Sequence, residues 1–167
     1  QVMSGIRRDA GIRYAVLTPN WRGFEGARAA RADGIVVFGA ASETFSQKNI
    51  NCSIAESLAR FRPVVMAALE SGIAVRGTVS CALGCPYEGV IAPEAVADVT
   101  RELLEMGCEE ISIADTIGVG TPDRTRMVME AVLEVVEDDH AARRDEARVG
   151  NVQLVRVRVG QALVVAD

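Results

Sequence analysis

Short apolar segments alternate with longer amphipathic ones along most of the chain. The apolar segments have the length and composition of β-strands, and glycine, proline or asparagine marks their ends. Residues 34–40 are apolar on both faces, which is typical of a strand covered by helices on both sides. Strands are predicted over residues 14–18, 34–40, 73–80 and 110–115.

The stretches between these strands carry helix boundary signals. Ser53 and Glu56 have the spacing of a capping box, and Gly72 marks the end of the helix that this box opens. Pro93 stands at the first turn of the next helix, and Thr121 precedes a proline as an N-cap residue does. Helices are predicted over residues 22–32, 53–71, 93–106 and 121–136.

Strand–helix repeats of about 30–40 residues, with polar or glycine-rich loops after the strands, are typical of α/β proteins. They fit either a (β/α)₈ barrel or a doubly wound sheet, and loop placement alone leaves both open. A complete barrel needs roughly 250 residues. The 167 residues would therefore form about half of a barrel, or one complete small domain.

Composition narrows the class of protein. The chain is 49% hydrophobic with a net charge of −5, so a basic surface for nucleic acid is not expected. No apolar run approaches the roughly 20 residues of a membrane span. The four cysteines are expected to be reduced thiols. Lys48 is the only lysine among 18 basic residues, an arginine bias that suggests a GC-rich bacterial genome. Because residues 1–8 do not resemble a signal peptide and no membrane span is evident, a cytoplasmic bacterial protein is expected.

Residues 79–89 form the loop richest in chemical groups, with two thiols, two glycines, a proline and a carboxylate. We expect this loop at the mouth of a parallel sheet, where backbone approaches a ligand. Cys81 and Cys85 lack the further ligands of a closed zinc site and the third thiol of an iron–sulfur cluster. No histidine lies near them in sequence to activate a thiol nucleophile.

Asp115 stands where a predicted strand ends, and two glycines follow it at residues 118 and 120. In a barrel its carboxylate would lie at the catalytic face. The alternative is that Asp115 only caps its own loop, and spacing does not choose between the two.

Arg76 interrupts an apolar strand, where a buried guanidinium needs a carboxylate or a ligand anion. It would either face the substrate or form an internal pair with Asp115 or Glu43. Thr78 and Ser80 alternate with Arg76 and share its face of the strand.

Residues 42–51 are polar and are predicted to form a loop. Within it, Lys48 could meet a phosphate or carboxylate, while Asn49 and Asn51 can donate and accept hydrogen bonds. A plain surface loop is the alternative.

Taken together, several of these segments closely resemble the hydroxymethylglutaryl-CoA lyase family. The resemblance covers residues 1–136 and implies a TIM barrel, among the metal-dependent lyases and acyl-CoA condensing enzymes. It implies cleavage of 3-hydroxy-3-methylglutaryl-CoA, an acyl-CoA, to acetyl-CoA and acetoacetate with a divalent cation, Mg²⁺ or Mn²⁺. The motifs that carry it are residues 16–20, 38–43, 48–53, 75–89 and 115–122.

The resemblance also implies roles for individual residues. Arg76 and Asp115 are the expected catalytic residues. The expected substrate-binding residues are Lys48, Asn49, Thr78, Ser80 and Thr116.

Departures from the family pattern concern the metal site. The family's Arg-Asp-Gly strand would lie before Gln1, and Leu154 and Arg156 stand where its His-x-His metal pair is expected. Of the motif that follows, Gly160-Gln-Ala-Leu remains. We therefore expect a central barrel fragment over residues 1–136 with no metal ligands of its own, and inactive when isolated.

Residues 137–167 read as a divergent tail, charge-dense at first and then alternating in a way that could form an edge strand. Two rival functions remain. One is a condensing enzyme of the isopropylmalate or homocitrate synthase type. The other is a non-catalytic half-barrel that associates with itself, for example as a homodimer, because an open sheet leaves strand edges unpaired.

Overall fold

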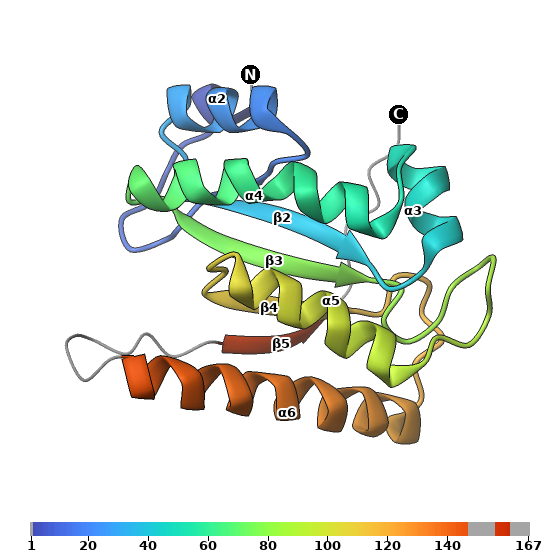
Figure 1. The fold of residues 1–167 in the computed structure, drawn as a ribbon. Helices are drawn as coiled ribbons and strands as arrows, with labels where there is room; N and C mark the ends of the chain where they lie inside the picture. Colours follow the sequence, from blue (N-terminus) through green and yellow to red (C-terminus); the bar gives the residue numbers. More distant parts are fainter. Residues whose placement is uncertain (1, 147–155, 161–167) are drawn as a thin grey trace.

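The computed structural model describes residues 2–146 and 156–160. Within these residues, parallel strands form one sheet in the order β1-β2-β3-β4-β5 (Figure 1). Neighbours in the sheet are also neighbours along the chain. The strands are β1 (Ala15–Leu17), β2 (Gly34–Ala40), β3 (Ala74–Ser80), β4 (Glu110–Ala114) and β5 (Arg156–Gly160).

This strand order separates the two folds that the residue pattern left open. A doubly wound sheet reverses its strand order at a switch point, whereas a barrel adds each new strand beside the last. The five described strands show no reversal. They form part of a (β/α)₈ barrel with four to five βα units, which confirms the fold that the family resemblance implied.

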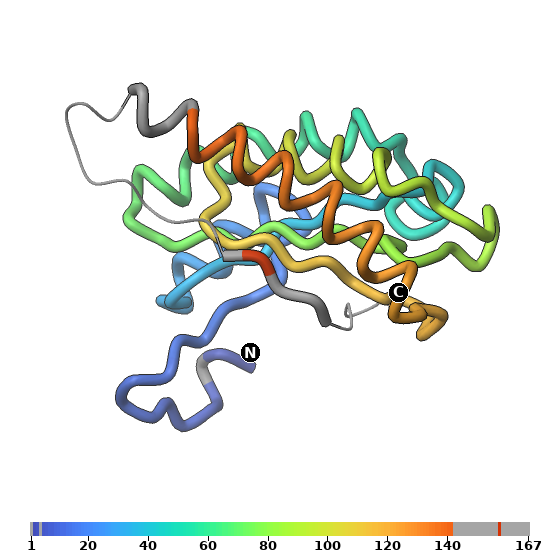
Figure 2. Tube along the Cα trace, turned by 90° about the horizontal axis from the view of Figure 1, so that it is seen from below, coloured from blue at the N-terminus to red at the C-terminus, as the bar shows by residue number. Residues whose placement is uncertain are grey.

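Helices follow the strands as predicted in position, and three of them lie side by side along one face of the sheet (Figure 2). These three are α4, α5 and α6, which bury apolar side chains against the strands and against one another. The described helices are α1 (Val2–Gly5), α2 (Trp21–Ala29), α3 (Glu43–Ile50), α4 (Ile54–Glu70), α5 (Pro93–Glu105) and α6 (Pro122–Glu146). None of them combines the length and apolar character needed to cross a membrane.

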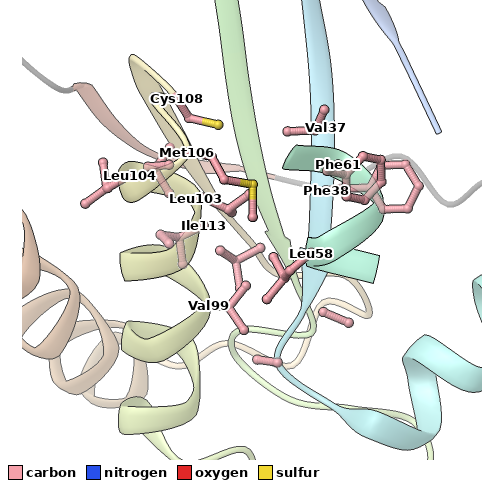
Figure 3. Close-up of a cluster of buried hydrophobic side chains, with 14 of the residues drawn as sticks. Val37, Phe38, Leu58, Phe61, Val99, Leu103, Leu104, Met106, Cys108 and Ile113 are labelled. Carbon is pink, nitrogen blue, oxygen red and sulfur yellow. The ribbon is translucent and has the colours of Figure 1, made fainter. Parts of the chain in front are cut away.

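The core lies between the sheet and these helices (Figure 3). Leu58 of α4 and Val99 and Leu103 of α5 meet Val37 and Ile113 of the strands. Helix α5 approaches the sheet closely because β2 has a glycine beneath it. A Cβ atom on Gly39 would lie 2.7 Å from Cγ1 of Val99.

Replacing Gly39 by alanine should therefore lower the free energy of unfolding by about 1–3 kcal/mol, because the added methyl group overpacks this contact. The exposed Gly26 of α2 has no atom within 4 Å of its Cβ position. Gly26→Ala should instead raise stability by about 0.5–1 kcal/mol through helix propensity. Urea unfolding of both variants tests the contrast, and equal effects at the two sites would contradict the packing argument.

Several predicted helix boundaries are confirmed. Ser53 and Glu56 form the capping box at the start of α4, with the Glu56 amide donating to Oγ of Ser53 and the Ser53 amide donating to the Glu56 carboxylate. Pro93 is the first residue of α5.

Two helices end elsewhere than predicted. Helix α2 ends at Ala29 rather than at residue 32. Just after it, Arg31 has a φ of 50°, and the Arg8 guanidinium donates hydrogen bonds to the carbonyl oxygens of Ala30 (2.6 Å) and Arg31 (2.5 Å). Helix α6 continues ten residues past Val136 to Glu146, because the charge-dense run consists largely of good helix formers.

The prediction of a loop over residues 42–51 is wrong, because residues 43–50 form helix α3. Ser42 accepts a hydrogen bond from the Phe45 amide at its start, and Asn51 ends it in the left-handed region with a φ of 51°. Phe45 and Ser46 are buried, so the helix is anchored to the barrel.

The alternating tail does form an edge strand over the described part, since β5 pairs with β4 in parallel. Leu154 and residues 161–163, which were compared with the family's metal-site strand, lie outside the described residues. The division between a barrel segment and a tail at residue 136 stays a prediction.

Candidate functional site

The carboxyl ends of the central strands carry the loops that the sequence marked as candidates. Figure 1 shows α3, the loop after β3 and the loop after β4 gathered at this edge. Backbone hydrogen bonds join the strand ends, from Ala41 N to Ser80 O (2.9 Å) and from Ala82 N to Ala114 O (3.2 Å). We call this region the carboxyl edge, defined by residues 41–51, 81–92 and 115–121.

Asp115 lies at the carboxyl edge directly after β4, and its carboxylate organises the following loop. Oδ1 accepts a hydrogen bond from the Val119 amide (3.1 Å) and Oδ2 accepts one from the Gly120 amide (2.9 Å). A Cβ on Gly120 would lie 2.9 Å from Oδ2, so only glycine permits this approach. The loop-capping reading of Asp115 is realised in the structure, and its catalytic role stays a prediction.

Replacing Asp115 by alanine should lower the free energy of unfolding by about 1–2 kcal/mol, because two amides lose a charged acceptor. The exposed Asp98 of α5 pairs with Arg101 at 2.7 Å, and Asp98→Ala should change stability by less than about 0.5 kcal/mol. Chemical denaturation of the two variants makes the comparison. Equal stabilities would mean that the Asp115 bonds contribute nothing.

Thr116 joins the two loops of the carboxyl edge. Its Oγ1 accepts a hydrogen bond from the Cys81 amide at 2.7 Å. Cys81 has a φ of 58°, an unusual conformation for a residue with a side chain, and this bond helps to hold it. The Thr116 side chain is thus engaged with the backbone while its residue remains partly exposed.

Arg76 lies further from the carboxyl edge than the other candidates, as the third residue of β3. Strand register sets it opposite Glu110, and the guanidinium Nε lies 3.1 Å from Oε1 of that carboxylate. An internal pair was one of the expected outcomes, but the expected partners were wrong. Glu43 instead accepts from the Ile54 amide (3.1 Å), and Asp115 accepts from its own loop.

Thr78 and Ser80 follow Arg76 along the same face of β3 toward the carboxyl edge. Thr78 is partly exposed, whereas Ser80 is buried. Register places Ser112 of β4 opposite Thr78, a hydroxyl that the sequence analysis did not single out. The alternation of polar residues in the short segment 110–114 was the signal for it.

Lys48 and Asn49 both lie on the last turn of α3. The Lys48 ammonium is exposed and lies 5.1 Å from the centroid of the Tyr87 ring. Asn49 is half-buried. The structure therefore brings Lys48 to the loop after β3, and the substrate-binding roles of both residues stay predictions.

Cys85 occupies a polar niche inside that loop. Its Sγ lies 3.0 Å from the Ser42 hydroxyl and accepts a hydrogen bond from the Tyr87 amide at 3.4 Å. Burial by itself raises the pKa of Cys85, but the bonds from Ser42, from the Glu88 amide and from Tyr87 outweigh it, and the net pKa lies below its ordinary value.

Cys81 has the opposite character. Burial raises the pKa of its thiol to about 12, and the neighbouring Cys85 adds to the effect. A protonated, buried thiol is a poor nucleophile. This environment does not favour a nucleophilic role for Cys81. All four cysteines are free and buried in the structure.

The sequence analysis missed the contact between Glu88 and the start of α3. Its Oε1 accepts a hydrogen bond from the Thr44 amide at the start of α3, at 2.7 Å. Hydrogen bonds from Thr44 hold the pKa of this carboxyl below its usual value. The loop after β3 is thus fixed to α3 by Glu88 and by the Cys85–Ser42 contact. The lone acid in a small-residue loop was the available signal.

The described residues do not fit a divalent cation. Among them, no three histidine, cysteine, aspartate or glutamate side chains are arranged to hold a metal ion. Both oxygens of Asp115, the carboxylate at the strand end, already accept backbone amides. Arg156 lies in β5, and a guanidinium cannot ligate a cation.

Comparison with known proteins gives a consistent answer. The chain is 58% identical over 136 residues to mouse cytoplasmic 3-hydroxy-3-methylglutaryl-CoA lyase and 57% identical over 136 residues to bovine mitochondrial hydroxymethylglutaryl-CoA lyase. Each match covers 81% of this chain but only 40% and 42% of the relatives. The chain thus spans about two fifths of their length.

Solved structures agree. The HMG-CoA lyase from Brucella melitensis superposes with a TM-score of 0.80 at 45% identity, over 96% of this chain and 59% of that one. An HMG-CoA lyase from Acinetobacter baumannii, solved in complex with coenzyme A and 3-methylmalate, gives a TM-score of 0.77 at 27% identity, over 95% and 55%.

One expectation is overturned by these relatives. The curated lyases named above are cytoplasmic or mitochondrial proteins of animals, so the prediction of a bacterial cytoplasmic protein is wrong. Arginine bias reports on codon usage and carries no information on compartment.

The HMGL-like family model matches residues 2–143, and the chain belongs to that family.

Proposed function

We propose that this chain supplies part of the active site of a carbon–carbon lyase that cleaves 3-hydroxy-3-methylglutaryl-CoA to acetyl-CoA and acetoacetate. The observation that carries the proposal is its 58% identity to a lyase named for that substrate, over a segment that contains the whole carboxyl edge. Active sites of barrel enzymes lie at this end of the strands.

The residues of the carboxyl edge, together with the end of β3, have the chemistry that such a substrate requires. Thr78 and Asn49 can donate hydrogen bonds to hydroxyl and carboxylate oxygens. Asp115 fixes the loop after β4 through the Val119 and Gly120 amides, and Thr116 fixes the loop after β3 through the Cys81 amide. These residues would bind and orient the substrate.

Cleavage begins when a base removes the proton of the tertiary hydroxyl group. The electrons then form the carbonyl of acetoacetate, the carbon–carbon bond breaks, and the enolate of the thioester is left to be protonated. Enzymes of this family are generally metal-dependent. The described residues do not fit such a cation, and we infer that its ligands lie outside them.

Two measurements on the purified 167-residue chain test the proposal. Calorimetric titration should show binding of 3-hydroxy-3-methylglutaryl-CoA, and an acetoacetate assay with Mg²⁺ or Mn²⁺ should show no cleavage. Absence of binding would contradict the proposed site. Metal-dependent cleavage by this chain would contradict the expectation that it is inactive when isolated.

Matched variants on α3 sharpen the binding test. Asn49→Ala should weaken binding about tenfold if its amide contacts the substrate. Gln47→Ala changes an exposed side chain on the same helix and should bind like the parent chain. Equal affinities for the two variants would remove Asn49 from the proposed site.

A further inference from the structure

Helix α3 depends on other parts of the chain to hold its position. It spans eight residues, whereas isolated helices shorter than about 12–15 residues are marginal in water. The first amides of a helix have no partner within it and need acceptors from outside. The Phe45 amide donates to the Ser42 hydroxyl at 3.1 Å, but the Thr44 amide donates to Glu88, 44 residues away, at 2.7 Å. The start of α3 is therefore fixed in part by the loop after β3.

The turn that carries Glu88 is closed on itself. The Cys85 amide donates to the Gly89 carbonyl at 2.8 Å, and the Gly89 amide donates to the Cys85 carbonyl at 2.9 Å. Pro86 restricts one further backbone torsion inside the turn, and Gly89 has a φ of 74°, a conformation that favours glycine. Glu88 thus extends from a constrained turn, which gives its carboxylate a defined place.

Two more contacts join this turn to α3. Sγ of Cys85 lies 3.0 Å from the Ser42 hydroxyl, and the ring centroids of Tyr87 and Phe45 are 6.5 Å apart. Glu88 makes the charged contact, because hydrogen bonds from Thr44 hold the pKa of its carboxyl below the usual value and keep it ionised at neutral pH. Hydrogen bonds to an ionised acceptor are roughly twice as strong as neutral ones, and an anion at the first turn also favours the helix dipole.

The opposite end of α3 carries residues that the proposed function assigns to the substrate. Lys48 and Asn49 lie on its last turn. A helix of eight residues is about 12 Å long, so a tilt at the Thr44 end displaces the Asn49 side chain. Hydrogen bonds weaken steeply when distance or angle departs from the preferred geometry. The contact at one end of α3 therefore bears on binding at the other.

We propose that Glu88 is a positioning residue for substrate binding, whose carboxylate holds the start of α3 so that the Asn49 amide group meets the oxygens of the substrate. The inference rests on the proposed function, since it requires Asn49 to bind the substrate. In this role Glu88 acts without touching the substrate. Its effect on affinity passes through α3.

Calorimetric titration of the 167-residue chain with 3-hydroxy-3-methylglutaryl-CoA tests this role. Glu88→Ala should raise the Kd about fivefold, because the start of α3 loses its charged acceptor. Glu88→Gln has the same length and keeps an oxygen acceptor for the Thr44 amide, so its Kd should stay within about twofold of the parent value. An unchanged Kd for Glu88→Ala would contradict the positioning role.

Glu56 provides the matched control. Its carboxylate accepts from the Ser53 amide at the start of α4, at 2.8 Å, so Glu56→Ala removes the same kind of bond from another helix. This variant should bind the substrate like the parent chain. Equal losses for Glu56→Ala and Glu88→Ala would mean that any weakened helix lowers affinity, and the proposal would be wrong.

A double-mutant cycle tests whether Glu88 acts through Asn49. Glu88→Ala should raise the Kd about fivefold in the parent chain but less than about twofold in Asn49→Ala, because the side chain that α3 positions is then missing. A fivefold loss in both backgrounds would show that the two residues act independently. That result would overturn the proposal and leave Asn49 in the proposed site.

Amide hydrogen exchange gives a measurement that needs no ligand. In Glu88→Ala the amides of α3 should exchange about fivefold faster, while those of Leu103 and Leu104 in α5 keep their parent rates. Unchanged exchange in α3, with substrate binding intact in the parent chain, would remove the positioning role and leave the proposed function standing. If the parent chain does not bind the substrate, both proposals fail.

Discussion

Replacing Leu103 by alanine is expected to lower the free energy of unfolding by about 3–5 kcal/mol. Leu103 is fully buried on α5 and lies over Gly77, whose missing Cβ would be 3.0 Å from the leucine Cδ1. Truncation removes the apolar contacts and leaves a cavity between helix and sheet, which the flat glycine surface below cannot fill. Urea unfolding followed by circular dichroism measures the loss.

Leu133 of α6 is the matched control, because it is the same residue type in an exposed position. Leu133→Ala should change stability by less than about 0.5 kcal/mol. A small loss at Leu103, comparable with that at Leu133, would show that α5 does not pack against the sheet as described.

The stability of the protein should fall steeply between pH 9 and pH 12 because of Cys108. Burial raises the pKa of this thiol from its ordinary value of 9.0 to about 12, with a smaller contribution from Glu109. Below pH 9 the thiol is protonated in both states and its contribution is fully present. Above pH 9 the unfolded thiol ionises first, so the contribution falls by about 1.4 kcal/mol per pH unit until the folded thiol also ionises.

Unfolding measured from pH 8.5 to 11 in the parent chain and in Cys108→Ala tests this expectation. At pH 8.5 the variant should be less stable than the parent because of the cavity left by the missing thiol. The difference in free energy of unfolding between the two should shrink as pH rises. Met106→Ala removes a neighbouring buried side chain that does not titrate, so its gap should stay constant. A constant gap for Cys108→Ala as well would contradict the prediction.

Much of the fold could be predicted from local patterns. The four strands over residues 14–18, 34–40, 73–80 and 110–115 lie within a few residues of β1 to β4, because a strand buried on both faces needs an unbroken apolar run. The capping box of Ser53 and Glu56 needs only its own two side chains and the first turn of α4. Such features depend on neighbours in sequence.

Helix α3 was missed although its boundary signals were present. Ser42 is a typical N-cap residue and Asn51 a typical C-cap residue, but the segment between them is polar and lacks a clear apolar stripe. Its stability comes from burial of Phe45 against the barrel and from the hydrogen bond between Glu88 and the Thr44 amide. Both are contacts that the local pattern does not reveal.

The candidate site divides in the same way. Asp115 was found because a polar residue at the end of an apolar strand is conspicuous in sequence, and Thr116 because the family motif includes it. Both lie at the carboxyl edge. The partner of Arg76 was assigned wrongly, because the choice among Glu43, Glu110 and Asp115 depends on the register between β3 and β4. Register is set by the packing of whole strands.

By itself the sequence determined most of the helices and strands, their order and the family, because these follow from residue periodicity, capping chemistry and the motifs of residues 75–89 and 115–122. Only the tertiary structure decided which charged groups meet. It set Arg76 against Glu110, tied Asp115 to its own loop, placed the Lys48 ammonium near the Tyr87 ring and joined Arg124 to the Leu83 carbonyl. Such pairings join residues far apart in the chain, and their geometry exists only once the sheet and its helices have packed.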